Sequence, residues 1–141
     1  MVYAGFWRRA VAYLIDVALL TGIGIAAFAL WAQALRPDAL IGWLETYPWV
    51  PLLVQGLYFA LLESSRLQGT LGKALLGLRV SDYDGRRIGL LRAIVRYFGR
   101  LISELILMLG FLMVLFTERK QGLHDFLART YVLTRDGDQV A

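Results

Sequence analysis

Two carboxylates lie inside apolar stretches of the chain, where their position points to chemistry. Asp16 stands in the run from Ala10 to Trp31, and Glu104 stands in the run from Leu101 to Phe116. A charged side chain inside a bilayer costs about 2.5 to 3.5 kcal/mol on insertion scales, so something must offset that cost. Such a carboxylate can bind a proton or a small cation, or it can form an ion pair that fixes helix packing.

The partners of Asp16 can be narrowed by helical spacing. Arg9, Tyr13 and Asp16 lie at positions i, i+4 and i+7, so a helix places them on one face. Arg9 lies about 10.5 Å from Asp16 along the helix axis, which is long for a direct contact. Tyr13 could bridge them, or an arginine from another helix could pair with Asp16. Arg96 and Arg100 are the candidates.

Glu104 has a simpler explanation within its own helix. It follows Arg100 by four residues, a spacing that favours a local ion pair. The alternative makes Glu104 a relay partner of Asp16 in an ion pathway.

The segment Gly69-Thr70-Leu71-Gly72-Lys73 resembles a phosphate-binding loop in composition. It does not fit the P-loop, because the first glycine is too close to the second and no serine or threonine follows the lysine. Backbone amides freed by the two glycines could still bind an anion or a lipid head group. A rigid turn that joins a membrane helix to a cytoplasmic cap is the interpretation we favour.

His124-Asp125 is a pair of residue types found in metal sites. His124 is the only histidine of the chain, and no further ligands gather near it in the sequence, so we expect no metal and no cofactor. Asp125 is better explained as a helix cap or an arginine partner. No nucleophile stands beside a base anywhere in the sequence, so we expect no enzymatic activity.

The composition indicates a membrane protein of one domain. Of 141 residues, 58% are hydrophobic and 18% are charged, against about 25% charged in an average soluble domain. A soluble core of this size could not bury so much apolar surface. The net charge of +4 fits basic loops near anionic lipid head groups better than nucleic acid, which we do not expect as a partner. Without cysteine, the chain can form neither disulfides nor thiolate sites.

The first half of the chain predicts two helices joined by an outside loop. A helix from about Phe6 to Trp31 is long enough to cross a bilayer and longer than the apolar part of a signal peptide, so we expect it to be retained. The loop from Ala32 to Pro48 follows. A shorter helix from about Trp49 to Leu62 has a proline in its first turn. The aromatic residues of this region predict an interfacial belt: Trp43, Tyr47 and Trp49.

The segment from Glu63 to Arg100 is strongly basic and therefore predicted to be cytoplasmic, together with the N-terminus. Within it, residues 78–81 read as a short strand that enters an Asp84-Gly85 turn. Residues 130–134 read as a second strand. A single short strand is not stable, so we expect the two to pair in a small cytoplasmic cap.

The stretch from Ile88 to Phe116 is ambiguous. Arg92, Arg96 and Arg100 form one basic stripe, which predicts an amphipathic helix lying in the membrane interface. The apolar run that follows is just short of a full span. A helical hairpin bent near Gly110, or a partly inserted helix, would keep the C-terminus on the cytoplasmic side and permit the strand pair.

Several motifs, taken in order, resemble the RDD family over about residues 3 to 134. They are Phe6-Trp7-Arg8-Arg9, Ala12-Tyr13-Leu14-Ile15-Asp16, Gly69-Thr70-Leu71-Gly72-Lys73, Gly77-Leu78-Arg79-Val80, Arg92-Ala93 with Arg96, and Gln121-Gly122-Leu123-His124-Asp125 with Thr130. These small, mostly bacterial membrane proteins are named for one arginine and two aspartates. The resemblance assigns those positions to Arg9, Asp16 and Asp125. It implies residence in the membrane, and transport or ion exchange is suggested for some members.

The expected protein is therefore an α-helical integral membrane protein of the bacterial cytoplasmic membrane. It has three to four membrane-embedded helices and a small two-stranded cytoplasmic β element. One hypothesis is transport of a small ion or solute, such as proton–cation exchange, by a homo-oligomer. The alternative is a non-enzymatic scaffold or accessory subunit whose charged residues stabilise helix packing. The expected partners are a bilayer with anionic head groups and a second copy or another membrane protein.

Overall fold

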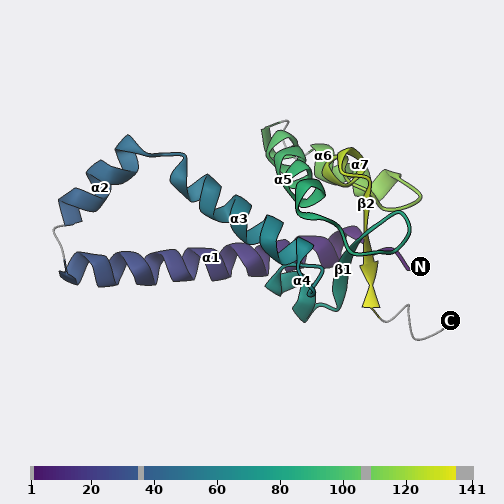
Figure 1. The fold of residues 1–141 in the computed structure, drawn as a ribbon, viewed down its shortest axis with the longest axis horizontal. Coiled ribbons are helices and arrows are strands. Elements are labelled where there is room, and N and C mark those ends of the chain that lie inside the picture. Colours follow the sequence, from purple (N-terminus) through teal and green to yellow (C-terminus); the bar gives the residue numbers. More distant parts are fainter. Residues whose placement is uncertain (1, 35–36, 106–108, 136–141) are drawn as a thin grey trace.

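Helices dominate the fold, and one of them runs most of the length of the molecule (Figure 1). The computed structural model describes residues 2–34, 37–105 and 109–135. Its elements are α1 (Phe6–Ala34), α2 (Pro37–Thr46), α3 (Val50–Ser64), α4 (Leu71–Leu75), β1 (Leu78–Asp82), α5 (Leu90–Leu105), α6 (Leu109–Phe116), α7 (Leu123–Leu127) and β2 (Thr130–Thr134).

The first helix confirms the expected long apolar segment. α1 has 29 residues, or about 43 Å at 1.5 Å per residue, against a hydrocarbon core of about 30 Å. Among the described residues, this is the one helix that is both long and apolar enough to cross a membrane. The second expected helix is also present: α3 has 15 residues, with Pro51 in its first turn.

The loop expected between residues 32 and 48 instead contains a helix, α2. Pro37 begins it, since a proline fits the first turn, where its missing N–H would have no helical partner. Pro48 follows its end, because proline cannot continue a helix. The aromatic side chains that predicted an interfacial belt touch one another here: the ring centroids of Trp43 and Tyr47 lie 5.4 Å apart, and those of Tyr47 and Trp49 lie 6.0 Å apart.

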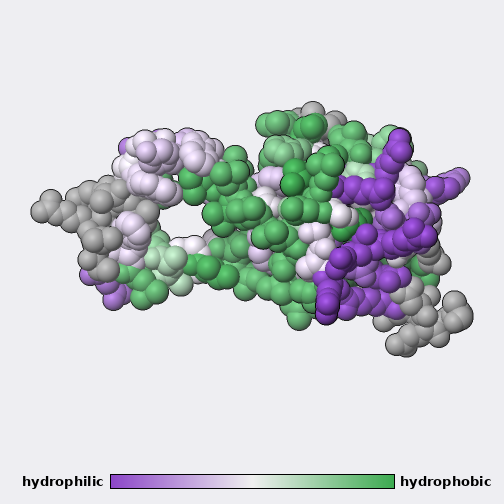
Figure 2. Space-filling model, viewed as in Figure 1, coloured by the Kyte–Doolittle hydropathy of each residue, from purple (hydrophilic) through white to green (hydrophobic). Residues whose placement is uncertain are grey.

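Much of the surface of α1 and α3 is apolar. Figure 2 shows hydrophobic atoms over the middle of the molecule and hydrophilic atoms gathered at the end that carries the strands. The exposed apolar side chains of these two helices include Ile23, Ile25, Leu30, Leu52, Leu53, Val54 and Leu57. Apolar surface of this extent needs lipid or another protein against it.

The two expected strands pair, as the sequence predicted. β1 and β2 run antiparallel, with Leu78 opposite Thr134 and Asp82 opposite Thr130. A bridge between Tyr3 and Leu133 attaches the N-terminal segment to the same sheet. The expected turn after β1 is also present, and Gly85 adopts a φ of +79° in it. The N-terminus, β1 and the end of β2 therefore lie on one side of the molecule (Figure 1).

The apolar run after α5 folds back instead of continuing in one direction. α6 packs against α5 and α7, which gives the expected hairpin-like arrangement. The bend was expected near Gly110, but Gly110 lies inside α6, so the chain does not bend at that residue. Residues 106–108 lie outside the described part of the chain.

The orientation of α5 corrects the prediction of a basic stripe at the membrane interface. Arg92 is exposed, but Arg96 and Arg100 are 1% and 5% exposed and point into the protein. The outward face is apolar instead, with Leu91, Phe98 and Leu105 exposed. The reason is that α3 and α7 pack against α5 and bring carboxylates to its arginine face.

Candidate functional site

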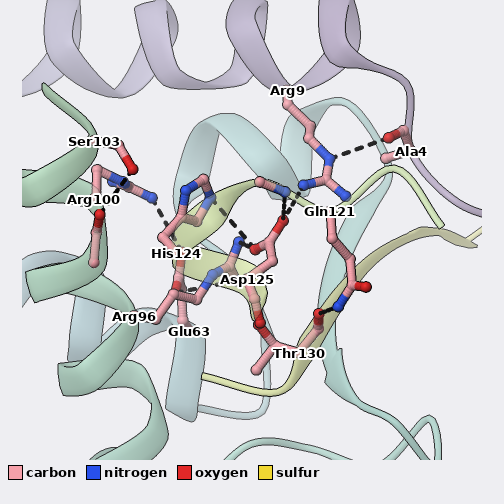
Figure 3. Close-up of polar contacts among 12 residues, drawn as sticks. Ala4, Arg9, Glu63, Arg96, Arg100, Ser103, Gln121, His124, Asp125 and Thr130 are labelled. Carbon is pink, nitrogen blue, oxygen red and sulfur yellow. Dashed lines mark hydrogen bonds and ion pairs between the residues drawn. The ribbon is translucent and has the colours of Figure 1, made fainter. Parts of the chain in front are cut away.

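A cluster of buried charges joins five helices where the long helix meets the cap, the part of the molecule formed by α4, α7 and the two strands (Figure 3). We call it the interior charge cluster. It consists of Arg9 on α1, Glu63 on α3, Lys73 on α4, Arg96 and Arg100 on α5, and Asp125 on α7. Charges removed from water must be paired and hydrogen-bonded, because isolated buried ions are very costly.

Asp125 is one of two acidic centres of the cluster and is fully buried. Arg9 donates through Nη1 to Oδ2, and Arg96 contributes Nη2 at 2.7 Å from Oδ1. The backbone N–H of Gly122 also donates to Oδ2, at 3.2 Å, and so caps α7. The expectation that Asp125 serves as a cap or an arginine partner is confirmed in both respects. Arg8 is exposed, so Arg9 is the arginine of this pair.

Glu63 is the second acidic centre, and the sequence analysis missed it. Its carboxylate binds Lys73 Nζ and lies 3.4 Å from Arg96 Nη1 and 3.7 Å from Arg100 Nη2. Glu63 ends an apolar helix and precedes a basic segment, where a lone acid reads as a helix terminus. Its negative charge could have pointed to it as an arginine partner, because few acidic residues stand in that basic segment.

Arg100 and Glu104 do not form the expected local pair. The guanidinium carbon of Arg100 lies 3.9 Å from the centre of the Phe59 ring and 5.4 Å from that of Tyr13, a cation–π arrangement. Glu104 instead accepts a hydrogen bond from the Tyr13 hydroxyl at 3.1 Å. Glu63 is the better partner for Arg100 because it is buried beside it, whereas Glu104 is only partly buried.

Asp16 is fully buried, and the expectation that Arg96 or Arg100 pairs with it is wrong. Its carboxylate accepts hydrogen bonds from the hydroxyls of Tyr58, at 2.8 Å, and of Thr70, and from the backbone N–H of Gly72, at 2.8 Å. The partners of Asp16 thus come from α3, from α4 and from the residue before α4, and not from the arginines of α5. Three neutral donors offset the cost of burying this carboxylate.

The glycine-rich segment therefore binds the chain's own carboxylates. Thr70 and Gly72 donate to Asp16, and Lys73 pairs with Glu63, so the segment is a turn that locks α4 against α1 and α3. Gly72 approaches α1 so closely that an added Cβ would lie 2.2 Å from the carbonyl oxygen of Ala12. Gly69 packs against the Lys73 side chain. These contacts confirm the expected turn, and contact of these residues with an anion or a lipid head group stays a prediction.

A cavity of about 460 Å³ lies beside the interior charge cluster. The ionisable residues on its wall are Arg9, Tyr13, Asp16, Lys73, Arg96, Arg100 and His124, and the rest of the wall is apolar. Glu104 is not part of this wall. The cavity brings Asp16 together with the arginines that sequence reasoning had assigned to it, without an ion pair between them. Among the described residues, no group of histidine, cysteine, aspartate and glutamate side chains could hold a metal ion.

Burial and crowding of positive charge control the ionisation of the cap residues. Burial, together with neighbouring Arg96 and Arg100, lowers the pKa of Lys73 to about 7 although Glu63 acts in the opposite direction. Burial and the same arginines lower the pKa of His124 to about 3. The pKa of the Asp125 carboxyl is lowered despite burial, because Arg96, His124 and Arg9 surround it.

These shifts predict that acid weakens the fold before the carboxylates titrate. Folded His124 stays neutral down to about pH 3, whereas an unfolded histidine takes up a proton near pH 6.5. Protonation therefore favours the unfolded chain as the pH falls below about 6.5. We expect the free energy of unfolding to drop by roughly 1 to 2 kcal/mol between pH 7 and pH 5.

Thermal unfolding in a neutral detergent at both pH values measures this effect. Because His124 is the only histidine, a His124→Gln variant should show much less difference between pH 7 and pH 5. An equal drop in both proteins would show that another group titrates.

Fold and site together define a class. It is a mostly helical fold with one apolar helix long enough to cross a membrane, a buried acid in that helix, a cluster of buried charges and a small two-stranded sheet. The RDD family model matches residues 3–129, and the chain belongs to the RDD family.

Two relatives from Bacillus subtilis support this assignment. The uncharacterised protein YxaI is 35% identical over 92% of this chain and 96% of its own length. The uncharacterised membrane protein YteJ is 32% identical over 93% of this chain and 80% of its own length. No solved structure matches the chain significantly.

Proposed function

We propose that this protein is a non-enzymatic, multi-pass protein of the bacterial cytoplasmic membrane that exchanges protons for a small cation as a homo-oligomer. Asp16 is the residue we propose to bind the exchanged ion. Its carboxylate is buried within the long apolar helix and lines the cavity.

The identity of the Asp16 partners is the observation that carries the proposal. Glu63 and Asp125 face cations, but Asp16 faces two hydroxyls and a backbone amide. A hydroxyl can donate to a carboxylate and can also accept a hydrogen bond from a protonated carboxyl. The hydroxyl oxygens of Tyr58 and Thr70 could also share a hard cation with Asp16, because such cations prefer oxygen ligands. Asp16 therefore has partners that suit exchange of a proton for a cation.

The direction of the elements supports the proposed topology. α1 leaves the cap, α2 lies at the far end, and α3 returns to the cap (Figure 1). The cap carries most of the basic side chains that follow α3, which favours the cytoplasmic side for the cap and the N-terminus. α6 and the apolar outer face of α5 would then enter the membrane from the cytoplasmic side.

An oligomer is proposed because one chain offers little to enclose a pathway. α3 covers only about 22 Å, and the apolar faces of α1 and α3 are largely exposed. A second copy against these faces would bury them and flank Asp16 with further helices.

The alternative is an accessory subunit whose buried charges only hold the helices together. The closed pairing of Glu63 and Asp125 with four cations favours this function. Burying such pairs fixes geometry but needs no transported ion.

Ion flux in liposomes tests the two proposals. The purified protein is compared with Asp16→Asn, which keeps the shape of the side chain, and with Asp84→Asn, an exposed matched control. We expect sodium-dependent proton flux in the unchanged protein and in the control, and a loss of about tenfold or more in Asp16→Asn. Cross-linking in the same liposomes reports the oligomer.

Two outcomes would contradict the proposal of proton–cation exchange. Flux that persists in Asp16→Asn would place the pathway elsewhere. No flux in the unchanged protein, across several cations and both directions of a pH gradient, would leave the accessory function as the better account.

A further inference from the structure

The cavity beside the interior charge cluster has an excess of positive charge on its wall. Arg9, Lys73, Arg96 and Arg100 line it, and Asp16 is the carboxylate that faces it with them. Glu63 and Asp125 neutralise part of this charge from behind the wall. With Lys73 protonated, these four cations and three carboxylates leave one positive charge uncompensated.

The arginines of this wall also have buried hydrogen-bond donors that are unused. In the three arginines beside this cavity, four buried guanidinium nitrogens have no hydrogen-bond partner in the part of the chain that the structure describes: Nη2 of Arg9, Nε of Arg96, and Nε and Nη1 of Arg100. Arg96 is 1% exposed and Arg100 is 5% exposed, so water reaches these arginines poorly. A buried donor without a partner costs about 1 to 3 kcal/mol and more when charged. Several such donors at one cavity indicate that an anion completes the site.

The remaining wall of the cavity is apolar and continues to the outer surface. It includes Ala10 and Leu14 on α1, Phe59 on α3, and Leu112 and Val114 on α6. Leu14 is 63% exposed and Leu112 is 38% exposed, so the cavity meets the apolar outside of the molecule between α1 and α6. Access from this direction would be through lipid, not through the aqueous cap.

We propose that this cavity binds the anionic head group of a membrane phospholipid, with the phosphate on the Arg9, Arg96 and Arg100 side chains and an acyl chain leaving between α1 and α6. A monoanionic phosphodiester supplies the single negative charge that the cluster lacks. Its oxygens accept hydrogen bonds from guanidinium groups, which match phosphate geometry well. Basic pockets between membrane helices on the cytoplasmic side bind lipid head groups in this way. The inference does not depend on ion exchange at Asp16.

Phosphate chemistry could also come from a free anion, and the apolar wall decides in favour of a lipid. A soluble phosphate would leave the exposed apolar side chains of Leu14 and Leu112 uncovered, whereas an acyl chain gains about 0.8 kcal/mol for each buried methylene. The two sources therefore differ in whether a chain is required for binding.

Lipid titration of the purified full-length protein in a neutral detergent tests the site. The probes are phosphatidylglycerol, phosphatidylcholine with the same acyl chains, and inorganic phosphate. Native mass spectrometry counts retained lipid, and thermal unfolding reports stabilisation. We expect one phosphatidylglycerol to be retained and to raise the unfolding temperature, with binding at least about tenfold tighter than phosphatidylcholine.

Three variants locate the binding. Arg100→Gln should weaken phosphatidylglycerol binding by about tenfold, and Arg92→Gln, on an exposed arginine of the same helix, should leave it unchanged. Because Arg100→Gln also removes a partner of Glu63, Leu14→Trp provides a second variant. It narrows the cavity beside α6 without touching any ion pair, and it should weaken lipid retention while the lipid-free protein unfolds near its usual temperature.

The result that separates this site from a charged surface is its resistance to salt. At about 0.5 M salt, where the screening length is about 4 Å, a buried phosphate contact should persist while surface attraction is lost. Equal binding of both lipids, equal protection by inorganic phosphate, loss of binding in salt, or unchanged binding in both Arg100→Gln and Leu14→Trp would overturn the proposal.

Discussion

Replacing Glu63 by glutamine should unfold the protein or lower its free energy of unfolding by about 3 to 5 kcal/mol. Glu63 is 2% exposed and faces Lys73, Arg96 and Arg100. Glutamine keeps the size of the side chain but removes the charge, so three cations lose the carboxylate they share. Breaking one member of a buried charge cluster leaves uncompensated charge that cannot reach water. Thermal and chemical unfolding in detergent would measure the loss.

Glu104→Gln is the matched control for this effect. Glu104 is partly buried and accepts a hydrogen bond from the Tyr13 hydroxyl, so loss of its charge should cost about 1 kcal/mol. The double variant Glu63→Gln with Lys73→Met should recover part of the stability, because it removes one of the stranded cations. Equal stability of Glu63→Gln and Glu104→Gln would show that Glu63 is not the centre of the cluster.

A single methyl group at position 72 should be almost as damaging. In Gly72→Ala the added carbon would lie 2.2 Å from the carbonyl oxygen of Ala12 and 3.1 Å from the carboxyl carbon of Asp16. Backbone stands on both sides of this contact, so α4 must move away from α1 and its hydrogen bonds to Asp16 must lengthen. Overpacking usually costs about 1 to 3 kcal/mol, and lost donors to a buried carboxylate add to that.

Gly24→Ala separates the steric effect from the general effect of glycine. Gly24 lies inside α1, and an added Cβ there meets nothing within 4 Å. Alanine in an open helical position should stabilise by about 0.5 to 1 kcal/mol. The opposite signs of the two substitutions, measured by unfolding in the same detergent, are the expected result. A neutral Gly72→Ala would contradict the close approach of α4 to α1.

Local physics made much of the fold predictable. Long apolar runs specify α1 and much of α3, because a run of that length can only be buried in lipid or in a large core. The residue types of β1 and β2 predicted strands, and the instability of a lone strand predicted their pairing. These inferences depend on neighbouring residues and on the solvent of each segment, so they need no knowledge of distant contacts. The sequence did not predict the helix α2, because a segment bounded by prolines between two apolar runs is typical of a loop.

The chain by itself determined the membrane setting and the two aspartates of the site, and the tertiary structure decided their partners. Asp16 stood out because its charge lies inside an apolar run, and Asp125 stood out because it follows the only histidine and matches the RDD motif. Helical spacing can only propose pairs three or four residues apart, which led to Arg100 with Glu104. In the folded chain, α3 instead carries Glu63 to the arginines of α5, and α4 carries Thr70 and Gly72 to Asp16. Buried charges pair with whichever opposite charge is brought within contact distance, and only the packing of distant helices sets that distance.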